Sequence, residues 1–168
     1  MSKKKRGFEI VEEAHRTAYE VFTDEKKRQH RFPLDITLPT RSDKGSAGYD
    51  FYLPKDVTLL PGHHEVVFTN VKAYMPDDEV LLVLVRSSLA IKQGLQLQNQ
   101  VGVIDASYYG NEGNDGNIGI ALSNPTGKTV QLAQGERIAQ GIFTKYYLAE
   151  DDAPTTEERK GGIGSSGK

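Results

Sequence analysis

The sequence has no cysteine, and its four histidines are scattered along 168 residues. Without cysteine, disulfide bonds and thiolate chemistry are excluded. The histidines form no His-x-x-x-His pair, so a zinc site is not expected either. No apolar run approaches the ~20 residues that a membrane-spanning helix needs. We therefore expect neither a thiol-dependent enzyme nor a membrane protein.

Charge of one sign is also lacking, because 21 basic and 23 acidic side chains give a formal net charge of −2. Domains that bind duplex nucleic acid usually carry a basic surface, so we expect no nucleic-acid partner. Residues 1–6 include the run Lys3-Lys4-Lys5-Arg6, and such a run is usually a solvated tail. No apolar segment of the secretory type follows it, so the expected location is the cytoplasm.

The sequence does contain 17 glycines and many short β-type runs. Its length suits one domain over residues 1–168. Short apolar runs separated by Gly and Pro are typical of a β-sandwich, jelly roll or barrel. The unbroken run at 80–85 predicts a strand buried on both faces. The expected strands cover residues 50–53, 57–60, 65–69, 71–74, 80–85, 95–97, 101–104, 118–122, 130–132 and 137–143.

Two interpretations compete near the N-terminus. Phe8 and Ile10 alternate with Glu9, which predicts a short strand. The alternative is a helix with apolar residues on one face over residues 11–22. Residues 23–33 are highly charged and end at a proline, so we expect an exposed loop there.

Two polar sites follow apolar strands. Arg86-Ser87-Ser88 comes directly after residues 80–85, and a guanidinium with two hydroxyls at a strand end suits an anion such as a phosphate chain. Asp105 ends the run 101–104, where a partly desolvated carboxylate could hold a water as nucleophile. The alternatives are an ordinary polar loop and an ordinary turn aspartate.

Two further segments are rich in glycine. Residues 111–117 read Asn-Glu-Gly-Asn-Asp-Gly-Asn, a plausible hairpin connection that requires no chemistry. Backbone N–H groups of residues 161–168 could surround phosphates, although the Walker A pattern is missing. The alternative for this end is a flexible tail. We find no Gly-x-Ser-x-Gly elbow and expect no covalent nucleophile.

Taken in order, five motifs from Leu38 to the last residue resemble those of the trimeric dUTPase family. Five ordered motifs are far more specific than any one of them. They are Ala47-Gly48-Tyr49-Asp50; Arg86-Ser87-Ser88-Leu89-Ala90; Asn99-Gln100-Val101-Gly102-Val103-Ile104-Asp105 followed by Tyr108-Tyr109-Gly110; Gly135-Glu136-Arg137-Ile138-Ala139-Gln140; and Arg159-Lys160-Gly161-Gly162-Ile163-Gly164-Ser165-Ser166-Gly167.

The resemblance implies an all-β, jelly-roll-like fold, a distorted β-barrel, that assembles as a homotrimer with active sites shared between subunits. It implies hydrolysis of dUTP to dUMP and pyrophosphate, which keeps uracil out of DNA. It also implies Mg²⁺, held by triphosphate oxygens and water with no protein ligand. Residues 151–168 would be a flexible arm that closes the active site.

The resemblance also assigns roles to residues. Asp105 would orient the water that attacks the α-phosphorus, and Asp50 would support the site. The phosphate-binding residues would be Arg86, Ser87, Ser88, Gln140, Arg159, Ser165 and Ser166. The residues that contact uracil or deoxyribose would be Asn99, Gly102, Val103, Ile104, Tyr108 and Ile163, with Tyr108 lying where a 2′-hydroxyl would sit.

The sequence departs from the family in four places. Ile163 stands where many members have a phenylalanine over uracil, and the lost stacking is worth roughly 1–3 kcal/mol in aromatic–base systems. Ser107 replaces an acidic residue that often precedes the tyrosine. Residues 111–117 lengthen the loop near the expected uracil pocket, and residues 14–32 have no counterpart.

Three other functions fit parts of this sequence. The related dCTP deaminases share Arg-Ser-Ser-Leu-Ala, but they carry an arginine where Ile91 stands and a glutamate where Ala121 stands. A dUTPase fold could instead act as a nucleotide-gated regulator that binds another protein through residues 14–32 and 111–117. The last alternative, a structural jelly-roll protein, does not account for five ordered motifs.

Overall fold

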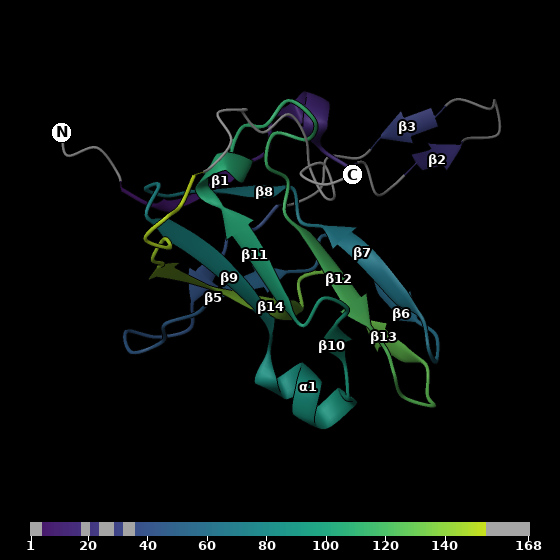
Figure 1. Cartoon of the computed structure of the whole chain (residues 1–168). Helices are drawn as coiled ribbons and strands as arrows, with labels where there is room; N and C mark the ends of the chain where they lie inside the picture. The colour runs from purple at the N-terminus through teal and green to yellow at the C-terminus, as the bar shows by residue number, and fades with distance from the viewer. Residues whose placement is uncertain (1–4, 18–20, 24–28, 32–35, 154–168) are drawn as a thin grey trace.

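The computed structural model describes residues 5–17, 21–23, 29–31 and 36–153 of the chain (Figure 1). These residues form mostly β-strands, with a single α-helix, α1 (Ser87–Gln93), and two short 3₁₀ helices, η1 (Glu13–His15) and η2 (Ala106–Tyr108). The predicted β class is therefore confirmed. Among the helices of the described residues, none is long and apolar enough to cross a membrane.

The largest sheet has five antiparallel strands in the order β11-β9-β14-β5-β4. They are β4 (Thr40–Arg41), β5 (Tyr49–Tyr52), β9 (Glu79–Val85), β11 (Val101–Asp105) and β14 (Arg137–Lys145). The first half of β9 is buried on both faces, as the apolar run predicts, and its end is partly exposed. This sheet carries three of the five motifs that suggested a function, and a fourth, Arg86–Ala90, begins directly after β9.

A second group of strands lies across from this sheet (Figure 1). It contains the three-stranded sheet β10-β12-β7 and the pair β13-β6, all antiparallel. The strands are β6 (Val57–Leu59), β7 (His64–Phe68), β10 (Gln96–Leu97), β12 (Gly119–Ser123) and β13 (Val130–Leu132). Phe51 and Leu81 from the large sheet and Ile120 and Leu122 from β12 belong to one buried cluster, so the two groups share a core.

The N-terminal strand β1 (Gly7–Ile10) pairs with β8 (Val71–Tyr74), which confirms the predicted strand. The alternative helix is not seen at residues 11–17, where only the three residues of η1 are helical. Phe8 accounts for the strand, because its ring packs between Phe51 and Phe143 at centroid distances of 5.6 and 5.3 Å.

The loop predicted for residues 23–33 is wrong at Thr23, the last residue of a strand, and at residues 29–31. Residues 29–31 form β3 (Gln29–Arg31), which pairs antiparallel with β2 (Val21–Thr23). Backbone hydrogen bonds define such a pair, so β3 can form from three polar residues that show no apolar alternation. The sequence therefore carried no signal for it.

Candidate active site

Asp50 organises the best-defined polar cluster of the large sheet. Its carboxylate is 4% exposed on β5, and its Oδ1 lies 2.9 Å from Nε of Arg86. Its Oδ2 lies 3.2 Å from Nη1 of Arg137 and accepts a 2.9 Å hydrogen bond from the hydroxyl of Ser42. Side-chain exposures of 23% for Arg86 and 45% for Arg137 let both guanidiniums reach solvent from one buried anchor.

The sheet register brings Gln140 to the same place. Gln140 lies opposite Asp50 on one side and opposite Leu84 on the other, two residues before Arg86. Gly48 approaches it so closely that a Cβ there would lie 2.5 Å from Oε1 of Gln140. This contact gives a physical reason for glycine in the first motif.

Ser87 and Ser88 are exposed in the first turn of α1, directly after Arg86. Gly94 ends this helix with φ 71°, and its N–H bonds to the carbonyls of Leu89 and Ala90. Together with Arg86 and Gln140, the serines form a group of cationic and neutral donors at one end of the sheet. Such a donor set suits phosphate oxygens.

The β11 hairpin presents a different surface. Within the described residues β11 is the end strand of its sheet, so alternate backbone N–H and C=O groups face away from β9. Val103 is 59% exposed and Val101 39%, whereas Gly102 is buried against Val83. Asn99 lies in the preceding turn, where its carbonyl accepts a 2.6 Å hydrogen bond from the N–H of Val101.

This free edge can pair with the edge of a planar base, with apolar side chains beside it. Ile104 is half-buried next to the exposed Val103 on the same strand. The predicted uracil-contacting residues from Asn99 to Ile104 therefore lie together on one hairpin.

Asp105 and Tyr108 follow at the far end of β11. Asp105 is exposed and lies opposite Val80, at the start of β9. Tyr108 is only 5% exposed, and its hydroxyl donates a 2.8 Å hydrogen bond to the carbonyl of Asn117. The turn thus holds an exposed carboxylate three residues from a buried phenol.

One chain does not bring Asp105 and Arg86 together. Asp105 pairs with Val80, whereas Arg86 follows Val85 at the other end of the same strand. At about 3.3 Å per residue the two positions are about 20 Å apart. Figure 1 shows the same separation, since the arrowhead of β11 points away from α1. The predicted residues Arg159, Ile163, Ser165 and Ser166 lie outside the described residues.

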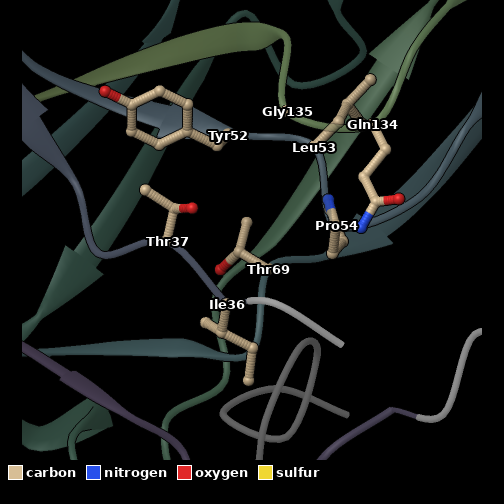
Figure 2. Close-up of a pocket in the computed structure, with 8 residues that line it drawn as sticks. All are labelled: Ile36, Thr37, Tyr52, Leu53, Pro54, Thr69, Gln134 and Gly135. Carbon is tan, nitrogen blue, oxygen red and sulfur yellow. The ribbon is translucent and has the colours of Figure 1, made fainter. Parts of the chain in front are cut away.

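A pocket of about 110 Å³ lies elsewhere, around the end of β5 (Figure 2). Its volume is well below the ~300–1,000 Å³ typical of ligand pockets. It is lined by Ile36, Thr37, Tyr52, Leu53, Pro54, Thr69, Gln134 and Gly135. None of these is a predicted site residue, so the pocket is not the candidate active site.

The sequence did not predict that residues 111–117 are largely buried and bonded to the rest of the fold. Asn111, Asp115 and Asn117 are buried, and the carboxylate of Asp115 lies 2.7 Å from Nζ of the buried Lys72. Burial raises the pKa of Asp115, but hydrogen bonds from the Glu12 backbone and from Lys72 outweigh it and hold the pKa below its ordinary value. The segment is therefore an internal part of the fold, which its polar composition did not indicate.

Comparison with known proteins agrees with the motifs. A family model described as dUTPase matches residues 35–167. The deoxyuridine 5′-triphosphate nucleotidohydrolase of Lactococcus lactis is 43% identical over 133 residues, which cover 79% of this chain and 89% of that protein. The enzyme of the same name from Corynebacterium glutamicum is 34% identical over 143 residues, covering 82% and 92%.

Solved structures show the same relationship. The crystal structure of dUTPase from Streptococcus mutans has a TM-score of 0.69 and 38% identity, covering 86% of this chain and 98% of that one. The dUTPase from phage phi11 of S. aureus has a TM-score of 0.63 at 22% identity, covering 92% and 99%, which is a likeness of fold. The predicted family and fold are thus confirmed, and the chain belongs to the dUTPase family.

Proposed function

We propose that this chain forms a homotrimer in which each active site is built from different copies. The chain is a member of the dUTPase family, which hydrolyses dUTP to dUMP and pyrophosphate. One copy supplies the β11 hairpin with Asp105, and another supplies Arg86, Ser87, Ser88 and Gln140. The observation that carries the proposal is the separation of Asp105 from Arg86 at opposite ends of β9. A cytoplasmic location, where nucleoside triphosphates are found, is part of it.

Asp105 is the residue that would act on water. It would orient the molecule for in-line attack on the α-phosphorus and accept its proton. The bond from the α-phosphorus to the bridging oxygen then breaks, and pyrophosphate leaves. Such a transfer depends on positioning and charge stabilisation and needs no covalent intermediate. In a single chain Asp105 is exposed, whereas its position after an apolar run had predicted a partly desolvated carboxylate. Its place at a strand end leaves the carboxylate accessible to water and substrate.

The donor cluster would stabilise the phosphates. Arg86 is held by the buried carboxylate of Asp50, so its guanidinium is already placed before a ligand arrives. Ser87, Ser88 and Gln140 add neutral donors beside it. Arg159, Ser165 and Ser166 keep their expected role in the proposal, with residues 151–168 closing over bound nucleotide and excluding water.

Base and sugar selection would depend on the hairpin. Backbone groups of residues 102–104, together with Asn99, would pair with uracil. Cytosine would leave those groups mispaired. Tyr108 would pack against deoxyribose, and Ile163 would cover the base without stacking.

Magnesium fits this site as an ion bound to the phosphates of the nucleotide. Both oxygens of Asp50 already bind Arg86, Arg137 or Ser42, and the remaining donors of the cluster suit anions. Mg²⁺ usually keeps several waters and binds through substrate phosphates. When bound, it would neutralise charge that develops on the phosphate oxygens. We therefore name no protein ligand for it.

The test is pyrophosphate release from dUTP, dCTP, dTTP and UTP with Mg²⁺, for the wild type and Asp105→Asn. We expect release from dUTP alone and a loss of at least about 100-fold in kcat for the variant. Asp56→Asn is the matched control, because Asp56 is an exposed aspartate whose oxygen accepts the N–H of Gln134. Full activity in Asp105→Asn would exclude the proposed role.

The matches favour neither alternative function. Ile91 is 83% exposed on α1, and Ala121 lies on β12 opposite Val66 of β7. Neither position therefore holds the polar group that a deaminase has there. A wild type that binds dUTP but releases no pyrophosphate would revive the regulator hypothesis.

A further inference from the structure

The residues 111–117, here called the insertion, fold back onto Tyr108. The amide nitrogen of Asn114 donates a 2.8 Å hydrogen bond to the Tyr108 hydroxyl, which itself donates to the carbonyl of Asn117. The amide nitrogen of Asn111 donates a 2.8 Å hydrogen bond to the backbone carbonyl of Tyr108. The insertion therefore holds both ends of this tyrosine.

The insertion is also ordered within itself. Oδ1 of Asn111 accepts the N–H groups of Gly113 and Asn114, and Oδ1 of Asn114 accepts the N–H of Gly116. Gly116, at φ 81°, packs so tightly that a Cβ would lie 2.8 Å from the carbonyl oxygen of Tyr108. A loop with this many internal bonds has a fixed shape.

Two anchors join the insertion to the rest of the fold. Asp115 binds Lys72 of β8 and the N–H of Glu12. The side chain of Asn117 accepts the N–H of Asn70 at 2.9 Å and donates to Oδ1 of the same residue at 3.0 Å. Because Asn70 and Lys72 flank the start of β8, the insertion rests on the sheet framework.

We propose that the insertion is a scaffold that fixes the Tyr108 ring, and that Asn114 is a positioning residue for rejection of ribonucleotides. The inference rests on the proposed function, in which Tyr108 packs against deoxyribose. Only 5% of Tyr108 is exposed, so a sugar would meet one small patch of the ring. That patch can exclude a 2′-hydroxyl only if the ring cannot move away from it.

The physical reason is that steric selection needs a rigid wall. An added hydroxyl is rejected when the ring cannot tilt to admit it. Hydrogen bonds to the phenol hydroxyl and to the backbone carbonyl of the same residue prevent such tilting. Loss of one bond at the phenol would let the ring move by a fraction of an ångström. The kcat/KM for UTP would then rise relative to that for dUTP, because dUTP needs no such movement of the ring.

The experiment measures kcat/KM for dUTP and for UTP in the wild type, Asn114→Ala and Tyr108→Phe. Each variant loses hydrogen bonds at the phenol, and we expect the ratio of dUTP to UTP to fall about 3- to 10-fold. Tyr108→Phe keeps the ring and its packing, so it tests the same bonds if Asn114→Ala does not fold. A ratio is independent of the fraction of active protein, so general destabilisation does not change it.

Asn124→Ala is the matched control. Asn124 is fully buried and donates to the carbonyls of Leu59 and Lys128, away from the insertion. We expect it to lower stability and leave the ratio unchanged. A wild-type ratio in both Asn114→Ala and Tyr108→Phe would overturn the inference while the wild type still hydrolyses dUTP. No release of pyrophosphate from dUTP by the wild type would instead overturn the proposed function, and the inference with it.

Discussion

At the scale of single residues, Asp50 shows how one buried carboxylate can place two arginines. Arg86 directly follows β9 and Arg137 begins β14, and each contacts one oxygen of Asp50. A guanidinium held in this way loses less freedom when it binds a phosphate, which favours binding. The charge of Asp50 acts through Arg86, so we describe Asp50 as a supporting residue.

The replacement Asp50→Asn tests this role. Asparagine has the same shape but no charge, so Arg86 and Arg137 lose charge-assisted hydrogen bonds that are worth about 1.5–3 kcal/mol each. We expect kcat/KM for dUTP to fall about 10- to 100-fold. Steady-state kinetics would measure it, with Ser42→Ala as a control that removes only a neutral hydroxyl from the same carboxylate. A kcat/KM equal to that of the wild type would show that Asp50 is not needed to place the arginines.

At the scale of elements, the buried pair of Lys72 and Asp115 ties the insertion to β8. The side chains are 8% and 9% exposed, so solvent screens them little. The pKa of Asp115 is lowered by folding. Its contribution to stability is therefore present at neutral pH and is lost as the pH falls through the folded-state pKa.

Asp115→Asn should remove this contribution and leave Lys72 without its charged partner. We expect the free energy of unfolding at neutral pH to fall by about 3 kcal/mol. The difference from the wild type should shrink as the pH drops below the ordinary aspartate range, because the wild-type carboxyl then takes up a proton. Urea unfolding at neutral and acidic pH measures both. A difference that stays constant across this range would contradict the assignment.

Elements also show what the sequence could and could not predict. Strands such as β9 and β14 were predictable, because apolar runs between Gly and Pro define them. Helix α1 was not predicted, since its seven residues bury only Leu89 and show no helical periodicity. The insertion was not predicted as a buried element either. Its asparagines pair with Tyr108 and Asn70, and sequence patterns carry no information on such pairs.

The candidate site was predictable in part for the same reason. Ordered motifs identified Arg86, Gln140 and Asp50, and the register of β14 with β5 and β9 does bring these three together. Two further residues of the same cluster had no such signal. Arg137 lay inside the fourth motif without an assigned role, and Ser42 was not singled out, yet both meet the carboxylate of Asp50.

At the scale of the whole molecule, the five-stranded sheet keeps two groups of the proposed site apart. Asp105 lies at one end of β11, and the donor cluster lies near the other end of the neighbouring β9. A site that needs both must therefore draw them from different copies. Closed symmetric assembly repeats such a contact once per subunit, so a trimer would contain three equivalent sites.

Subunit complementation tests this arrangement directly. Asp105→Asn and Arg86→Ala should each be inactive alone, because every site then lacks one group. Co-refolded at equal amounts, the two should regain about a quarter of the wild-type activity, since a random assembly pairs an intact Asp105 with an intact Arg86 in that fraction of sites. The matched control is the double variant Asp105→Asn/Arg86→Ala co-refolded with wild type, where a site is intact only if both of its copies are wild type, again about a quarter. If the site lay within one chain, this control would retain half of the activity and the mixture of single variants none. The mixture of single variants therefore distinguishes a shared site from an internal one.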